Sequence, residues 1–191
     1  MQYIVDVQGF KRPLNAFTFK EVAITALEED AVPVVYLFKP PYSWESLPGR
    51  FKSENSWLTR NFHCIPWEAG EIPYADVQEV LMAALKDATR VYVKGLEKKK
   101  WLGQLVPHVR NLEDLGCPSL SRLANNRKRC THHVCCSRPV CAEYNVEVLL
   151  EWFMNRNSSF NGVDFDFNSN LKHENLKILK CKNKNGKINL I

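Results

Sequence analysis

The sequence predicts an α/β fold in which a mixed five-stranded sheet carries helices on its faces. Three apolar segments rich in β-branched and aromatic residues follow one another at the start, "QYIVDVQGF", "FTFKEVAITAL" and "VPVVYLFKPP". A helical repeat of apolar residues comes next, in "YADVQEVLMAALKDA". Strand and helix patterns then alternate to the last strong helix, which predicts parallel crossovers after an antiparallel start.

The first three predicted strands are joined by short links and therefore form an antiparallel meander. Pro40 and Pro41 end the third strand because proline cannot continue a sheet ladder. From Tyr42 to Pro73 no regular period is evident, and this segment contains Trp44, Trp57 and Trp67. A loop this long and aromatic is expected to pack across the domain face.

Four shorter patterns complete the domain. "TRVYVKGL" predicts a fourth strand, "KKKWLGQLV" a short helix, "PHVRNLEDLG" a fifth strand and "CPSLSRLANN" one or two helical turns. "AEYNVEVLLEWFMN" predicts the last helix, and from Asn155 the composition turns to Asn and Lys. We therefore expect a domain over residues 1–154 with a Cys/His-rich insertion at 117–141, and a poorly ordered extension over 155–191.

Composition sets broad limits on function. The chain has 191 residues, of which 45% are hydrophobic, and a net charge of +5. This permits nucleic-acid contact without requiring it. No apolar run approaches the roughly 20 residues of a membrane span, and the N-terminus reads as a core strand without a charged leader. We therefore expect an intracellular protein, in cytoplasm or nucleus, whose seven cysteines are mostly reduced.

Several stretches, in order, resemble the DnaQ-like 3′-to-5′ exonucleases, which have the ribonuclease H-like fold. "YIVDVQGF" resembles their first motif, an apolar strand ending in Asp-x-Glu, and "FKEVAITAL" resembles their second strand. "FHCIPWEAGEIPYADVQEVLMAAL" resembles the segment that often carries His-Gly-Ile. "DATRVYVKGLEKKKWL" and "CAEYNVEVLLEWF" resemble the last two motifs. The resemblance covers residues 1–154 and implies a ribonuclease H-like sheet with Asp6 on its central strand.

The resemblance also implies a degenerate catalytic site. These exonucleases use four carboxylates to hold two metal ions and a His as general base. Asp6 remains here, but Gln8, Lys98 and Asn145 stand at the places of acids and Val140 at that of the His. Lys98 would repel divalent ions, which disfavours magnesium or manganese and predicts a non-catalytic domain. Two alternatives stay open, namely that Asp6 only caps a turn, or that a rearranged active nuclease uses Asp6 and Glu97 with Glu21 or Asp114.

A cysteine- and histidine-rich stretch, "GCPSLSRLANNRKRCTHHVCCSRPVCAEYN", predicts a structural zinc site. The preferred ligands are Cys117, Cys130, His133 and Cys141. Other sets would use His132, Cys135 or Cys136, and the alternatives to zinc are reduced cysteines without metal or a disulfide. The Maelstrom domain, an exonuclease-like fold without the usual acids, is similar in outline because it also carries zinc.

Two basic runs, "KGLEKKKW" and "NNRKRC", predict contacts with phosphates. The candidate residues are Lys98, Lys99, Lys100, Arg127, Lys128 and Arg129, with Trp101 and the loop tryptophans as stacking surfaces. RNA or single-stranded DNA is the expected partner. The alternatives are a solvated helix face, or a protein-interaction scaffold that binds no nucleic acid.

Overall fold

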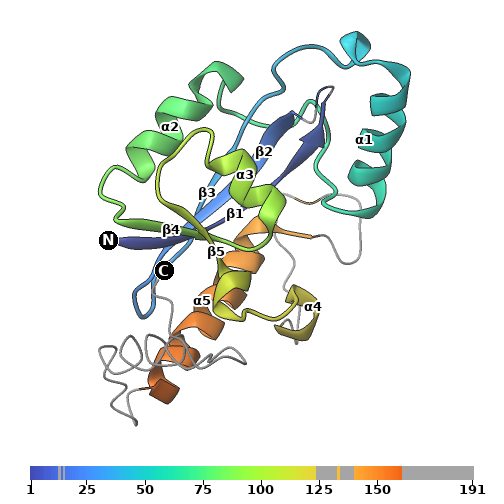
Figure 1. The fold of residues 1–191 in the computed structure, drawn as a ribbon. Coiled ribbons are helices and arrows are strands. Elements are labelled where there is room, and N and C mark those ends of the chain that lie inside the picture. The colour runs from blue at the N-terminus through green and yellow to red at the C-terminus, as the bar shows by residue number, and fades with distance from the viewer. Residues whose placement is uncertain (13, 15, 124–132, 134–139, 161–191) are drawn as a thin grey trace, which may run out of the picture. The chain divides into compact units, whose positions relative to one another are not determined.

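A five-stranded mixed sheet forms the centre of the fold (Figure 1). The computed structural model describes residues 1–12, 14, 16–123, 133 and 140–160. The strands lie in the order β3-β2-β1-β4-β5, so that β1 (Gln2–Lys11) is central. β1 pairs antiparallel with β2 (Phe17–Ala26), which pairs antiparallel with β3 (Val34–Leu37). β4 (Arg90–Val93) and β5 (Val109–Asn111) continue the sheet in parallel, which confirms the predicted mixed α/β architecture.

A β-bulge interrupts the register between β1 and β2. Gln8 faces Glu21, but the next residue, Gly9, faces Phe19, so that Lys20 is the extra residue on β2. Gly9 is required here because a Cβ atom at this position would lie 1.9 Å from the carbonyl oxygen of Thr18. Before the bulge, the hydrogen-bonded ladder runs without a break from Tyr3 to Gln8.

Helices cover both faces of the sheet (Figure 1). On one face, α2 (Val77–Ala84) and α3 (Leu96–Leu102) pack through Leu81 and Leu102 onto residues of β1, β2 and β4. On the other face, α5 (Ala142–Phe160) packs through Val146 and Leu149. Because side chains alternate along a strand, Val5 and Val7 join the first core, whereas Ile4 joins the second.

The segment from Tyr42 to Pro73 differs from the prediction, because it contains a helix of 13 residues, α1 (Gly49–Asn61). Phe51 and Leu58 pack this helix against a small core that includes Phe10 and Trp67. Apart from the exposed Trp57, the rest of the helix is polar or small, and its one buried residue is Asn55, so the sequence lacks a clear apolar stripe. Figure 1 shows α1 beside the tip of the β1–β2 hairpin.

Short elements complete the unit formed by residues 1–154. They are the 3₁₀ turns η2 (Trp44–Ser46), η3 (Tyr74–Asp76) and η4 (Leu112–Leu115), and the helix α4 (Leu120–Leu123). Within the described ranges, no helix has the length and apolar character needed to cross a bilayer.

Candidate functional site

Asp6 is the centre of a buried polar cluster. Its side chain is fully buried and accepts three hydrogen bonds. Nε2 of Gln8 lies 3.0 Å from Oδ2, and Nδ2 of Asn145 lies 2.9 Å from the same oxygen. Nζ of Lys98 lies 2.5 Å from Oδ1 and forms an ion pair with it. The three residues that the resemblance assigns to lost carboxylates therefore all contact the one carboxylate that remains.

The topology explains why residues so distant in sequence meet here. Asp6 and Gln8 are two positions apart on β1 and share the face that α5 covers. Asn145 lies in the first turn of α5. Lys98 is on α3, which begins directly after β4, the parallel neighbour of β1. Gly95, with a φ of +105°, turns the chain into α3, and its N–H donates to Oδ1 of Asn111 over 2.9 Å.

The positive and negative charges in the Asp6 cluster balance one another, so the cluster needs no metal ion to neutralise it. The Lys98 ammonium balances the Asp6 carboxylate, and the two amide groups direct N–H donors, not oxygen ligands, at it. Among the described residues, the only group of three or more potential ligands within 4.8 Å of one another does not include Asp6. Val140 lies outside these contacts, and its backbone N–H donates to the carbonyl of Phe62 over 2.8 Å.

That group of potential ligands consists of Glu21, His133 and Cys141, which are all buried and could hold a metal ion. Nε2 of His133 lies 3.1 Å from Oε1 of Glu21, and Sγ of Cys141 lies 3.9 Å from the same oxygen. One carboxylate oxygen, one imidazole nitrogen and one sulfur form a donor set that suits zinc. A fourth donor would complete the tetrahedron that structural zinc prefers.

Each of the three side chains is held by a second contact. Nδ1 of His133 bonds the carbonyl of His63, which leaves Nε2 directed at Glu21, and this is the usual orienting contact of a metal-bound imidazole. Oε2 of Glu21 accepts the N–H of Ala142 over 2.9 Å. Sγ of Cys141 accepts the N–H of Tyr144, in the first turn of α5, over 3.5 Å.

The surroundings shift the pKa of His133 and of the neighbouring His63. Burial acts to lower the pKa of His133, but the hydrogen bond and negative charge of Glu21 outweigh it and raise the pKa above its usual value. Burial lowers the pKa of the neighbouring His63 to about 4, so its imidazole is neutral at pH 7. A neutral His63 adds no positive charge that would oppose a bound cation.

Of the predicted zinc ligands, the described residues bring His133 and Cys141 close together. Cys130 lies outside the described residues, as do His132, Cys135 and Cys136. Cys117 is packed elsewhere, in the core beside α5, where burial raises the pKa of its free thiol. Cys64 is disulfide-bonded and is an exception to the expectation of mostly reduced cysteines, whereas Cys117 and Cys141 are free. Sequence reasoning did not assign Glu21 to this site, although a carboxylate within the apolar strand "FKEVAIT" indicates a buried partner.

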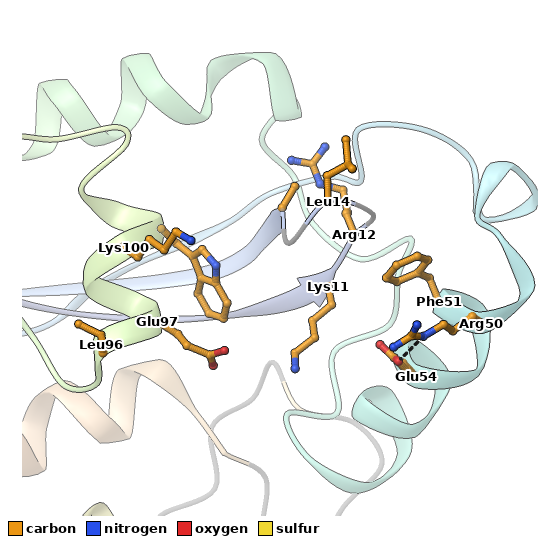
Figure 2. A pocket seen from close by; sticks show the side chains of 11 residues that line it. Lys11, Arg12, Leu14, Arg50, Phe51, Glu54, Leu96, Glu97 and Lys100 are labelled. Atoms are coloured by element: carbon orange, nitrogen blue, oxygen red, sulfur yellow. Dashed lines mark hydrogen bonds and ion pairs between the residues drawn. The ribbon is translucent and has the colours of Figure 1, made fainter.

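A groove lies beside the Asp6 cluster and contains two cavities. The outer cavity, of about 590 Å³, is bounded by the hairpin tip, α1 and α3 (Figure 2). The inner cavity, of about 520 Å³, reaches Gln8 and Lys98 and is walled by residues of α1 and α3. Lys11, Leu96, Glu97 and Trp101 line both cavities, which makes them one continuous groove.

The predicted nucleic-acid residues are distributed unevenly. The ammonium group of Lys98 is ion-paired with Asp6, and Nζ of Lys99 lies 3.8 Å from Oδ2 of Asp114. Lys100 lines the outer cavity, and Trp101 lines both cavities while stacking on Phe17 with the ring centres 4.0 Å apart. Residues 127–129, with Arg127, Lys128 and Arg129, lie outside the described residues. Sequence reasoning missed Lys11, Arg12 and Arg50, because they come from separate elements and form no basic run.

No protein-family model matches the chain, and no curated protein is similar to it in sequence at a significant level. The function therefore has to be inferred from the Asp6 cluster, the Glu21–His133–Cys141 group and the groove.

Proposed function

We propose that residues 1–154 form a non-catalytic module related to the DnaQ-like exonucleases, with the ribonuclease H-like fold. In this proposal the module binds RNA or single-stranded DNA and carries one structural zinc ion. The observation that carries it is the convergence of Gln8, Lys98 and Asn145 on Asp6. Residues separated by more than a hundred positions meet where the resemblance places a two-metal site.

Two features of the backbone support the relationship. The strand order β3-β2-β1-β4-β5, with β2 antiparallel to its neighbours, is the arrangement that the resemblance implies. Cys64 has a φ of 57°, a conformation that favours glycine. It stands in "HCI", where the exonucleases often carry His-Gly-Ile, so the local backbone conformation fits even though the residue differs.

Loss of catalysis follows from the electrostatics of the Asp6 cluster. Two-metal catalysis needs several carboxylates to offset the charge of two divalent ions. Here one carboxylate is already neutralised by Lys98 at 2.5 Å, and two amides replace acids. A divalent ion would have to displace the ammonium group and would find too few oxygen ligands.

Binding is a separate property, because phosphate contacts need only basic side chains. The groove keeps Lys11, Arg12, Arg50 and Lys100 next to exposed aromatic rings. Nucleic-acid binding can therefore persist after the metal site is lost.

The test uses purified full-length protein and labelled single strands of DNA and RNA. With magnesium or manganese, we expect no shortening from the 3′ end above background, and binding that needs no divalent ion. The Asp6→Ala variant serves as the control for contaminating nuclease. Degradation that disappears in this variant would overturn the proposal and favour a rearranged active nuclease.

A further inference from the structure

We propose that the groove is a two-part track for a single nucleic-acid strand, in which the inner cavity holds one unstacked base and the outer cavity holds the adjoining phosphates. This rests on the proposed function and adds to it the position of each part of the ligand. Figure 2 shows the outer cavity enclosed by the hairpin tip, α1 and α3, with Lys11, Phe51 and Glu97 directed into the space between the two helices.

The outer cavity is suited to phosphates because of its charge. Lys11, Arg12, Arg50 and Lys100 line it together with Glu54 and Glu97, so basic side chains outnumber acidic ones. Within the described part of the chain, neither Lys11 nor Lys100 is in an ion pair. Arg50 pairs with Glu54, but its side chain is 82% exposed, and such a surface pair is weak enough to exchange for a phosphate.

The inner cavity is suited to a base because most of its surface is apolar, with aromatic rings on both sides and charged side chains such as Lys94 and Glu113 among the remaining lining residues. Trp57 and Phe62 form the wall on the α1 side, and Trp57 is 55% exposed. Leu96, which is 71% exposed, and Trp101 form the wall on the α3 side. Phe17, which also lines the cavity, stacks parallel on Trp101. Large exposed apolar side chains gathered in one place indicate a binding surface, and bases stack on such rings whatever their sequence.

The arrangement of the two walls selects for single strands. The inner cavity lies between residues of two helices and has a floor that includes Gln8 and Gly9. A base can enter it only after it has left its stack and its pairing partner, and a base in a duplex would need to be flipped out at an energetic cost. We therefore expect single strands to bind and duplexes to bind weakly.

Binding is measured by fluorescence anisotropy with a labelled oligonucleotide, the matching duplex and an abasic oligomer of equal length. Trp57→Ala should weaken binding of the single strand by about 5- to 150-fold, the usual loss on removing one stacked base. It should leave binding of the abasic oligomer unchanged, because that ligand has phosphates but no base. Met82→Ala is the control, since Met82 is also exposed and lies outside the groove.

Phosphate contacts are tested through salt dependence. The double variant Lys11→Glu and Lys100→Glu should weaken binding of the strand and of the abasic oligomer alike. It should reduce the slope of log affinity against log salt by about 0.7 for each lost contact. The double variant Lys39→Glu and Lys86→Glu makes the same charge change on two exposed residues outside the groove and should have a smaller effect. Thermal unfolding of each variant checks that the fold is retained.

The outcomes separate this inference from the proposed function. If the wild type binds single strands but folded Trp57 and lysine variants match their controls, the track is wrong and the proposed function stands. If the wild type binds no single strand at low salt, both fail. If an acidic polypeptide binds more tightly than the oligonucleotide and depends on the same residues, the groove is a protein-docking surface and the track is overturned.

Discussion

Nζ of Lys98 lies 2.5 Å from Oδ1 of Asp6, and this ion pair joins α3 to the central strand. The Asp6 side chain is fully buried, whereas that of Lys98 is 21% exposed. The lysine therefore reaches in from the groove to neutralise a charge that has no access to water. An unpaired buried carboxylate is costly, so the pair contributes to the stability of the fold.

The first prediction concerns this pair. Lys98→Ala should lower the free energy of unfolding by about 3 to 5 kcal/mol, because it leaves a buried charge with only amide partners. Asp6→Asn combined with Lys98→Ala should cost much less than the sum of the single changes, since the residues interact directly. Urea unfolding of the four proteins measures the coupling. Additive losses would show that the two side chains do not interact in solution.

The second prediction concerns restoration of a metal site. The triple variant Gln8→Glu, Lys98→Asp and Asn145→Asp places three new carboxylates beside Asp6. We expect magnesium or manganese to raise its thermal unfolding temperature, because the ions offset the repulsion among four acids. The wild type should respond far less. The matched control is Lys98→Asn alone, which removes the ammonium without adding acids. Equal responses of the triple variant and this control would argue against a retained two-metal geometry.

The third prediction concerns zinc. Elemental analysis of freshly purified, reduced protein should find about one zinc per chain, as one structural site requires. Glu21→Gln and Cys141→Ser should each lower the zinc content, whereas Cys117→Ser should not, because Cys117 lies outside the Glu21–His133–Cys141 group. Replacement of zinc by cobalt should give a thiolate absorption band that Cys141→Ser weakens.

The Cys117 variant decides between two ligand sets. Loss of zinc in Cys117→Ser with full retention in Glu21→Gln would favour the set predicted from sequence alone. Absence of zinc from the reduced wild type would instead favour buried thiols without a metal. Chelation should also increase hydrogen exchange at the start of α5, because the N–H of Ala142 bonds Glu21.

The fourth prediction concerns Lys20, whose ammonium group is fully buried and donates to the carbonyls of Phe38, Trp67 and Ala69. These contacts hold the segment after α1 against β2. Lys20→Met should lower the free energy of unfolding by about 3 kcal/mol, because it leaves buried carbonyl groups without a donor. Hydrogen exchange should increase around Trp67 before the rest of the domain.

The contribution of Lys20 should also depend on pH. Burial lowers its pKa from 10.5 to about 8, although the charge of Glu68 acts in the opposite direction. Between these two values the unfolded chain binds more protons than the folded one, so stability rises as pH rises through this window. The difference in unfolding free energy between the wild type and Lys20→Met should therefore grow from pH 8 upward. A constant difference would place the pKa of Lys20 near its ordinary value.

Sequence patterns were sufficient for the sheet because its strands are continuous and apolar. The apolar run in "YIVDVQGF" and the helical repeat of apolar residues in "DVQEVLMAAL" both indicate buried elements. The helix over Gly49–Asn61 was missed because it is polar and packs through Phe51 and Leu58 onto aromatic residues from other elements. Such tertiary contacts cannot be recognised from the periodicity of a short segment of sequence.

The sites were predictable to the extent that local motifs describe them. The places of Gln8, Lys98 and Asn145 followed from the resemblance, but their contacts with Asp6 depend on three elements packing together. Glu21 could not be joined to His133 and Cys141, because more than a hundred residues separate them and only the fold brings them within reach. Lys11, Arg12 and Arg50 of the groove were missed for the same reason, whereas Lys100 lies in a basic run and was predicted.

The bulge at Lys20 also changes which side chains of β2 point to which face of the sheet. Glu21 and Ala23 face α5, whereas Phe17 and Phe19 join the core on the opposite face with Val22 and Ile24. Odd-numbered positions thus change sides across one extra residue. Without residue 20 the strand would alternate regularly and would still direct Phe17 and Phe19 to one face and Glu21 to the other, so the extra position is free for a different task. That task belongs to Lys20, whose ammonium group bonds the carbonyls of Phe38, Trp67 and Ala69. The inserted residue therefore ties β2 to neighbouring chain segments while the strand keeps Glu21 on one face and Phe17, which stacks on Trp101, on the other.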